Sequence, residues 1–174
     1  MEIQEALSLI RNEKITGNKI QHWYDLGAGT GTFTIALAHF LGDGSKIVAI
    51  DENNASLRKI PSHINQIVIE TIKEDFTSSD LPYPDFDGIL MANSLHYVKN
   101  KFSLIERISK HLKADHYFLI VEYDTEKSNQ WVPYPTDFSS LTKLFTELGY
   151  RSIEKLGEKK SRYNTGKMYA ALIS

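Results

Sequence analysis

Glycines alternate with other residues between Asp25 and Gly31, where the chain reads Asp-Leu-Gly-Ala-Gly-Thr-Gly. The stretch follows an apolar run and opens a helical pattern, a position at which glycines let a ligand approach bare backbone amides. Asp51 lies 20 residues after Gly31, at the end of the next apolar run. A carboxylate placed there can accept hydrogen bonds from both hydroxyls of an adenosine ribose. Together the two features predict a pocket for an adenosyl ligand, although the loop alone could serve helix packing and Asp51 could be an ordinary strand-end acid.

The stretch Asp25–Gly31, taken with Val48-Ala49-Ile50-Asp51, resembles the class I S-adenosylmethionine-dependent methyltransferases over nearly the whole chain. The resemblance implies that the glycine loop holds the methionine part of S-adenosylmethionine and that the acid holds its ribose. Asp75 and Phe76 fall at the position that reads adenine, although they also sit in a charged turn that a solvated loop would contain. The cofactor-binding residues predicted in this way are Asp25, Gly27, Ala28, Gly29, Gly31, Asp51, Glu52, Asp75, Phe76, Asn93 and Ser94.

Two other functions remain open from the sequence. An NAD(P)-dependent oxidoreductase would use a similar loop, but its fingerprint places a third glycine where this chain has Thr32. A catalytically silent module could keep the pocket and bind the cofactor or a protein partner without transferring a methyl group.

The methyl acceptor is predicted to lie beyond the fourth strand. A sulfonium methyl is already activated, so the protein must mainly align the acceptor and exclude water, and a general base is needed only if the acceptor must lose a proton. His96 could act as that base or could simply pack beside the cofactor, so the catalytic residue is left open. Loops past the strand ends supply the other candidates. The predicted substrate-binding residues are His96, Trp131, Tyr134 and Tyr163.

Composition limits the partners and the compartment. The chain has 174 residues, a net charge of −2, a pI of about 6.3 and no cysteine. We therefore expect a small-molecule acceptor, no nucleic acid, no membrane segment and a cytoplasmic location. The histidines do not stand at metal-ligand spacing, so no metal site is expected. The oligomeric state is not predicted.

Alternating strand and helix patterns must position these residues. Strand patterns cover Ile20–Leu26, Lys46–Ile50, Gln66–Ile72, Phe86–Ala92, His116–Tyr123, Arg151–Leu156 and Met168–Ile173, with helical patterns at Thr32–Leu41, Asn54–Ile60, Phe102–Leu112 and Asp137–Leu148. We expect one α/β domain over residues 1–174, with a doubly wound, mostly parallel seven-stranded sheet, helices on both faces and a C-terminal antiparallel hairpin. A helix over Glu2–Arg11 is predicted to form part of a lid made by residues 1–19.

Overall fold

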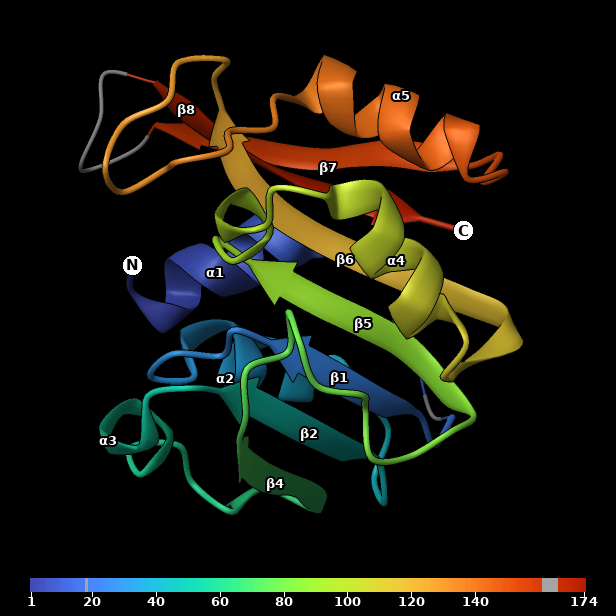
Figure 1. Ribbon diagram of the computed structural model, residues 1–174. Helices are drawn as coiled ribbons and strands as arrows, with labels where there is room; N and C mark the ends of the chain where they lie inside the picture. Colours follow the sequence, from blue (N-terminus) through green and yellow to red (C-terminus); the bar gives the residue numbers. More distant parts are fainter. Residues whose placement is uncertain (18, 161–165) are drawn as a thin grey trace.

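A mixed sheet organises the chain. Figure 1 shows the computed structural model, which describes residues 1–17, 19–160 and 166–174. In these residues eight strands pair in the order β3 (His63–Ile64), β4 (Ile67–Lys73), β2 (Lys46–Asp51), β1 (His22–Leu26), β5 (Phe86–Ala92), β6 (Leu112–Asp124), β8 (Lys167–Ile173) and β7 (Ile153–Lys160). Strands β4, β2, β1, β5 and β6 are parallel, whereas β3 and the β6-β8-β7 end are antiparallel.

The predicted fold class is confirmed, with one strand more than the seven expected. The additional strand, β3, has two residues and pairs with β4. A turn at Asn65 and Gln66 joins them, and Asn65 has a φ of 52°, a conformation that asparagine tolerates better than most residues. A two-residue strand is too short to give an alternating pattern in the sequence.

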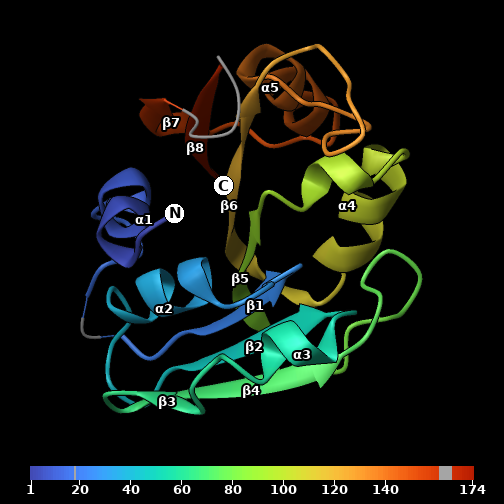
Figure 2. The same ribbon diagram turned by 90° about the vertical axis from the view of Figure 1, so that its left-hand side faces the viewer.

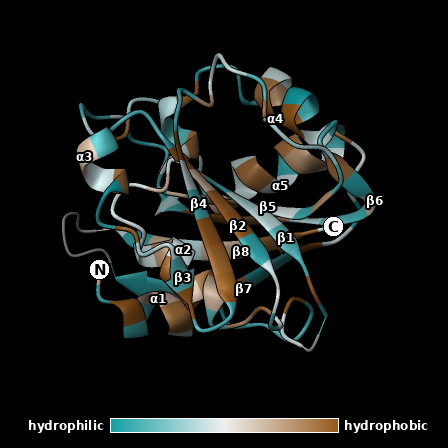
Figure 3. Ribbon diagram, turned by 90° about the horizontal axis from the view of Figure 1, so that it is seen from below, coloured by the Kyte–Doolittle hydropathy of each residue, from teal (hydrophilic) through white to brown (hydrophobic). Residues whose placement is uncertain are grey.

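Helices cover both faces of the sheet (Figure 2). On one face lie α1 (Ile3–Ile10), α2 (Thr32–Ala38) and the short α3 (Asn54–Leu57), and on the other lie α4 (Lys101–Ser109) and α5 (Phe138–Glu147). Neighbouring residues of β1 point to opposite faces of the sheet. Trp23 packs in the core between the sheet and helices α1 and α2, and Tyr24 packs in the core between the sheet and helices α4 and α5. Seen from below, hydrophobic residues run along β2 and β4, while the helices show both hydrophobic and hydrophilic stretches (Figure 3).

The strand β6 begins earlier than predicted. The helical pattern extended to Leu112, but α4 ends at Ser109, and Leu112 pairs with Phe86 of β5 as the first residue of a strand of 13 residues. An apolar residue at helical spacing fits a short strand equally well, and here the pairing with β5 decides.

The connection from β4 to β5 is a loop over residues 74–85, with no helix in it. Arg107 of α4 holds this loop by donating hydrogen bonds to the backbone carbonyls of Phe76, Thr77 and Ser79. The Tyr24 hydroxyl donates to the Tyr83 carbonyl at 2.9 Å and accepts from the Tyr83 N–H at 2.8 Å. These bonds hold the loop against α4 and against the face of the sheet that α4 covers.

The N-terminal helix α1 is packed into the domain. Its residues Ala6, Leu9 and Ile10 are buried in the core that includes α2. The lid function of residues 1–19 stays a prediction, as does the single-domain boundary. None of the helices in the described ranges is long and apolar enough to span a membrane.

Candidate active site

The glycine loop follows β1 at the edge where the parallel strands end. Gly27, Gly29 and Gly31 all have positive φ, and the Gly27 N–H donates to the Ile50 carbonyl at 2.8 Å. A Cβ on Gly27 would lie 2.4 Å from the Cβ of Ser94, whereas a Cβ on Gly29 would meet no atom of the described residues within 4 Å. Gly27 therefore allows close contact between the loop and the end of β5, and Gly29 presents bare backbone to open space.

Asp51 ends β2 and faces the glycine loop. Its Oδ2 accepts a hydrogen bond from the Gly29 N–H at 2.8 Å, and its Oδ1 accepts one from the Asn53 N–H at 2.8 Å. A carboxylate has about four acceptor positions, so each oxygen keeps capacity for a further donor. The geometry suits two ribose hydroxyls, while the neighbouring Glu52 is exposed.

Asp25, the last but one residue of β1, is buried, with 1% of its surface exposed. Its Oδ2 accepts a hydrogen bond from the Thr34 hydroxyl of α2, but its buried Oδ1 has no hydrogen-bond partner among the described residues. Burial raises the pKa of Asp25 to about 7, and the Thr34 hydroxyl partly opposes this.

Asn93 supplies a second buried acceptor at the same edge. It follows β5 with a φ of 55°, and its Oδ1 is likewise buried without a partner in the part of the chain that the structure describes. Buried polar atoms are rarely left without a donor in native proteins. Each of these two oxygens is therefore open to a donor such as an amino or ammonium group of a ligand.

The remaining predicted cofactor residues have structural partners. Asp75 is exposed and accepts hydrogen bonds from the backbone and hydroxyl of Thr77, which together with other contacts lower the pKa of its carboxyl group. Phe76 is buried, and its ring lies 3.4 Å from the position of a Gly27 Cβ. The Ser94 hydroxyl donates to the Leu26 carbonyl at 2.6 Å. Ala28 and Gly31 belong to the loop backbone, and cofactor contact by all these residues stays a prediction.

A hollow of about 850 Å³ opens beyond the ends of β5 and β6. Two predicted substrate residues line it, His96 and Trp131, and 71% of the Trp131 surface is exposed. Asn93, which was expected to hold the cofactor, lines it too. The rest of the lining was not in the predicted substrate-binding set: Tyr97, Tyr123, Asn129, Gln130 and Val132. Such a lining of aromatic and amide side chains is typical of a site for a small flat molecule.

Tyr134 and Tyr163 differ from Trp131 in position. Tyr134 is not among the residues that line the hollow; its N–H donates to the His96 carbonyl at 3.0 Å, and its carbonyl accepts from Lys101 Nζ at 2.8 Å. It therefore supports the backbone at His96. Tyr163 lies outside the described residues, so its predicted substrate contact is not placed.

Sequence reasoning missed Glu122, the partner of His96. Glu122 is fully buried in β6, and its Oε2 lies 2.7 Å from His96 Nδ1. The available signal was a single acid inside the apolar run that begins at Phe118, but no local pattern connects it to a histidine 26 residues earlier.

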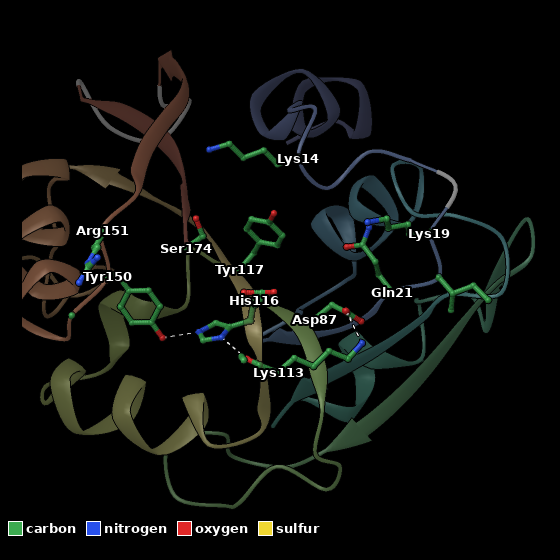
Figure 4. Close-up of a pocket in the computed structure, with 14 residues that line it drawn as sticks. Lys14, Lys19, Gln21, Asp87, Lys113, His116, Tyr117, Tyr150, Arg151 and Ser174 are labelled. Carbon is green, nitrogen blue, oxygen red and sulfur yellow. Dashed lines mark hydrogen bonds and ion pairs between the residues drawn. The ribbon is translucent and has the colours of Figure 1, made fainter.

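A larger hollow of about 1240 Å³ lies at the opposite, amino-terminal edge of the sheet (Figure 4). Three of its charged residues form ion pairs: Lys113 Nζ lies 2.7 Å from Asp87 Oδ1, and Lys14 Nζ lies 2.9 Å from Glu154 Oε2. Ligands of open α/β sheets bind outside the carboxyl ends of the strands, so size alone does not make this hollow the active site.

The arrangement of strands and helices is that of the Rossmann-like methyltransferases, as similar solved structures show. A SAM-dependent methyltransferase from Aquifex aeolicus aligns over 100% of both chains with a TM-score of 0.65 and 18% identity. A SAM-dependent methyltransferase from Leishmania major aligns over 97% of this chain and 70% of its own, with a TM-score of 0.72 and 17% identity. At such identities the likeness concerns the fold.

Sequence comparison gives the family. A family model described as a methyltransferase domain matches residues 24–115. The ubiquinone/menaquinone biosynthesis C-methyltransferase of Shewanella frigidimarina is 30% identical over 107 residues, which cover 59% of this chain and 43% of the relative. That of Shewanella baltica is 25% identical over 138 residues, covering 77% and 51%. The chain belongs to the methyltransferase-domain family, which confirms the class I resemblance, and it spans about half the length of these relatives.

Proposed function

We propose that this chain transfers a methyl group from S-adenosylmethionine to a small flat molecule. The observation that carries the proposal is two buried acceptors beside the glycine loop, Asp25 Oδ1 and Asn93 Oδ1, which have no donor among the described residues. The amino group of the methionine part would satisfy them, and Asp51 would accept the ribose hydroxyls. When bound, the cofactor supplies a methyl group activated by its sulfonium centre.

The chain's own residues would then position the acceptor and exclude water. Asn93 borders both the cofactor residues and the acceptor hollow, so the two sites share a wall. Trp131, Tyr97 and Tyr123 offer aromatic faces to a flat ring and to the positive sulfur centre. The curated relatives are C-methyltransferases of ubiquinone and menaquinone biosynthesis, which supports a small-molecule acceptor. Independence from nucleic acid and a cytoplasmic location stay predictions from the charge and composition.

Two binding and activity measurements test the proposal. Titration calorimetry with S-adenosylhomocysteine should show binding, and a metabolite extract incubated with methyl-labelled S-adenosylmethionine should yield a labelled small molecule. Binding without transfer to any extract component would favour the silent module, and failure to bind would contradict the proposal. Family membership already argues against the NAD(P)-dependent oxidoreductase.

The buried carboxyl of Asp25 predicts that cofactor affinity depends on pH. A ligand ammonium group is held best by an ionised carboxylate, and the pKa of Asp25 is about 7, so affinity for S-adenosylhomocysteine should rise several-fold between pH 6 and pH 7.5. Asp51 also faces Asp25 and raises its pKa, although less than burial does. Calorimetry across this range should show the rise in the wild type and its loss in Asp25→Asn.

The Asp25 carboxyl also makes the stability of the fold depend on pH. The folded protein holds the Asp25 proton more tightly than the unfolded chain does, so its contribution to stability is lost as the pH rises from about 4 to about 7. Relative to wild type, Asp25→Asn should therefore become more stable over this window, as measured by thermal unfolding. A constant difference in stability between the two proteins, or an unchanged pH dependence of binding in the variant, would contradict the assignment.

Trp131→Ala should weaken acceptor binding without affecting the cofactor. Because Trp131 is largely exposed, its loss should leave the fold intact, while loss of ring stacking should raise the KM for the acceptor about tenfold. Initial rates with the acceptor recovered from the extract measure this, and the affinity for S-adenosylhomocysteine should be unchanged. Phe102→Ala, which removes an exposed ring on α4, is the matched control. An unchanged KM in Trp131→Ala would remove this residue from the acceptor site.

A further inference from the structure

His96 and Glu122 form a buried pair in the wall of the acceptor hollow. His96 comes from the short 3₁₀ helix η1 (Leu95–Tyr97) after β5, and Glu122 comes from the carboxyl end of β6. Only 2% of the His96 side chain and 1% of the Glu122 side chain are exposed. The histidine nevertheless borders the hollow together with Tyr97 and Trp131.

Glu122 holds the histidine at two points. Its Oε2 lies 2.7 Å from the ring Nδ1, and its Oε1 accepts a hydrogen bond from the His96 backbone N–H at 3.1 Å. An ionised carboxylate accepts hydrogen bonds and does not donate them, so beside an ionised Glu122 the ring proton is on Nδ1. In the neutral ring, Nε2 then carries the lone pair that can take a proton.

The groups around the pair come from several elements. Tyr97 of η1 and Tyr123 of β6 place their rings 4.4 Å and 5.9 Å from the His96 ring, measured between centroids. Lys101 of α4 and Tyr169 of β8 both interact electrostatically with Glu122. Burial lowers the pKa of Lys101 and raises that of Tyr169. In this set Glu122 is the carboxylate that bonds the ring directly, and it would stabilise the imidazolium formed when Nε2 accepts a proton.

We propose that His96 is the general base of the methyl transfer, that Glu122 is its positioning residue, and that the acceptor carries an acidic hydroxyl on a flat ring. This inference rests on the proposed function. The hydroxyl proton moves to His96 Nε2, and its electron pair stays with the acceptor. The acceptor forms the new bond to the methyl carbon as the methyl–sulfur bond breaks and leaves its electron pair on sulfur. A carboxylic acid acceptor would need no base, and the buried Glu122 would repel its charge.

Nitrogen NMR of the histidine rings tests the proton position without any turnover. In protein labelled with ¹⁵N-histidine, the signals missing from His96→Gln identify His96, and they should show a proton on Nδ1 at pH 7.5. In Glu122→Gln the amide offers one oxygen for two N–H donors, so the preference for Nδ1 should weaken. A proton on Nε2 in the wild type, or identical ring signals in Glu122→Gln, would overturn the positioning role.

Kinetics with matched probes test the acceptor class. Naphthols and the corresponding naphthoic acids are incubated with methyl-labelled S-adenosylmethionine, and label should enter the naphthols and not the acids. His96→Gln should lower kcat about a hundredfold. Glu122→Gln should lower it about tenfold, because the imidazolium loses its carboxylate. The exposed residues His63 and Glu106 provide the controls His63→Gln and Glu106→Gln, which should retain full activity.

The outcomes separate this inference from the proposed function. If the wild type does not bind S-adenosylhomocysteine in calorimetry, the proposed function fails. If it binds, the inference alone fails when His96→Gln keeps the wild-type rate, when naphthoic acids are methylated as well as naphthols, or when neither set is methylated. An unchanged affinity for S-adenosylhomocysteine in His96→Gln and Glu122→Gln shows that their effects arise in the transfer step.

Discussion

Asp51→Ala is expected to weaken the binding of S-adenosylhomocysteine more than 100-fold. The variant would lose two hydrogen bonds from ribose hydroxyls to a charged acceptor, each contributing about 1.5–3 kcal/mol. It would also release the Gly29 N–H, which Asp51 now holds at 2.8 Å, so the glycine loop would be less well ordered for the ligand. Titration calorimetry measures the loss.

The matched control is Asp43→Ala, which removes an exposed acid at the opposite end of β2. Asp43 accepts a hydrogen bond from Gln66 and lies before the strand begins, so its loss should leave the affinity within about twofold of the wild type. An affinity loss of less than tenfold in Asp51→Ala would mean that this carboxylate does not hold the ribose.

Gly27→Ala should abolish detectable binding of S-adenosylhomocysteine and also destabilise the fold. The added Cβ would lie 2.4 Å from the Ser94 Cβ and 3.1 Å from its Oγ, so the end of β5 must move away from the loop. Overpacking costs about 1–3 kcal/mol, and the φ of 78° adds about 1–2 kcal/mol for a residue with a Cβ. Thermal unfolding should show a Tm lower by roughly 10 °C.

Gly149→Ala is the control that separates the backbone strain in Gly27→Ala from its steric clash with Ser94. Gly149 has a φ of 93°, but a Cβ there would meet no atom within 4 Å in the part of the chain that the structure describes. This variant should therefore lose only about 1–2 kcal/mol and keep its affinity for the ligand. Equal losses of stability in the two variants would show that contact between the glycine loop and Ser94 contributes nothing beyond backbone strain.

Much of the fold could be predicted because local patterns and long-range pairing agree. Strand β5 matches its predicted bounds, since the apolar run at its end, Ile89–Ala92, can be buried on both faces of a parallel sheet. The sequence pattern predicted the wrong boundary between α4 and β6, where the same residue fits either element. Leu112 fits the end of a helix locally, and only its partner Phe86 shows that it starts β6.

The edge of the sheet that holds the site was predictable, but the contacts within it were not. Asp25, Asp51 and Asn93 lie at or next to the carboxyl ends of parallel strands, and these ends meet at one edge of the sheet. The partners Thr34 and Glu122 come from other elements, so sequence spacing could not connect them with Asp25 and His96. Tyr134 lies in the predicted loop but supports His96 through its backbone, a role that residue type does not reveal.

A crystal structure of the protein with S-adenosylhomocysteine tests the central claim most directly. The account predicts that both ribose hydroxyls lie within hydrogen-bond distance of the Asp51 carboxylate and that the ligand's amino group meets the buried oxygens of Asp25 and Asn93. Ligand density at the opposite edge of the sheet, in the hollow of Figure 4, with both of these oxygens still unpartnered, would contradict it.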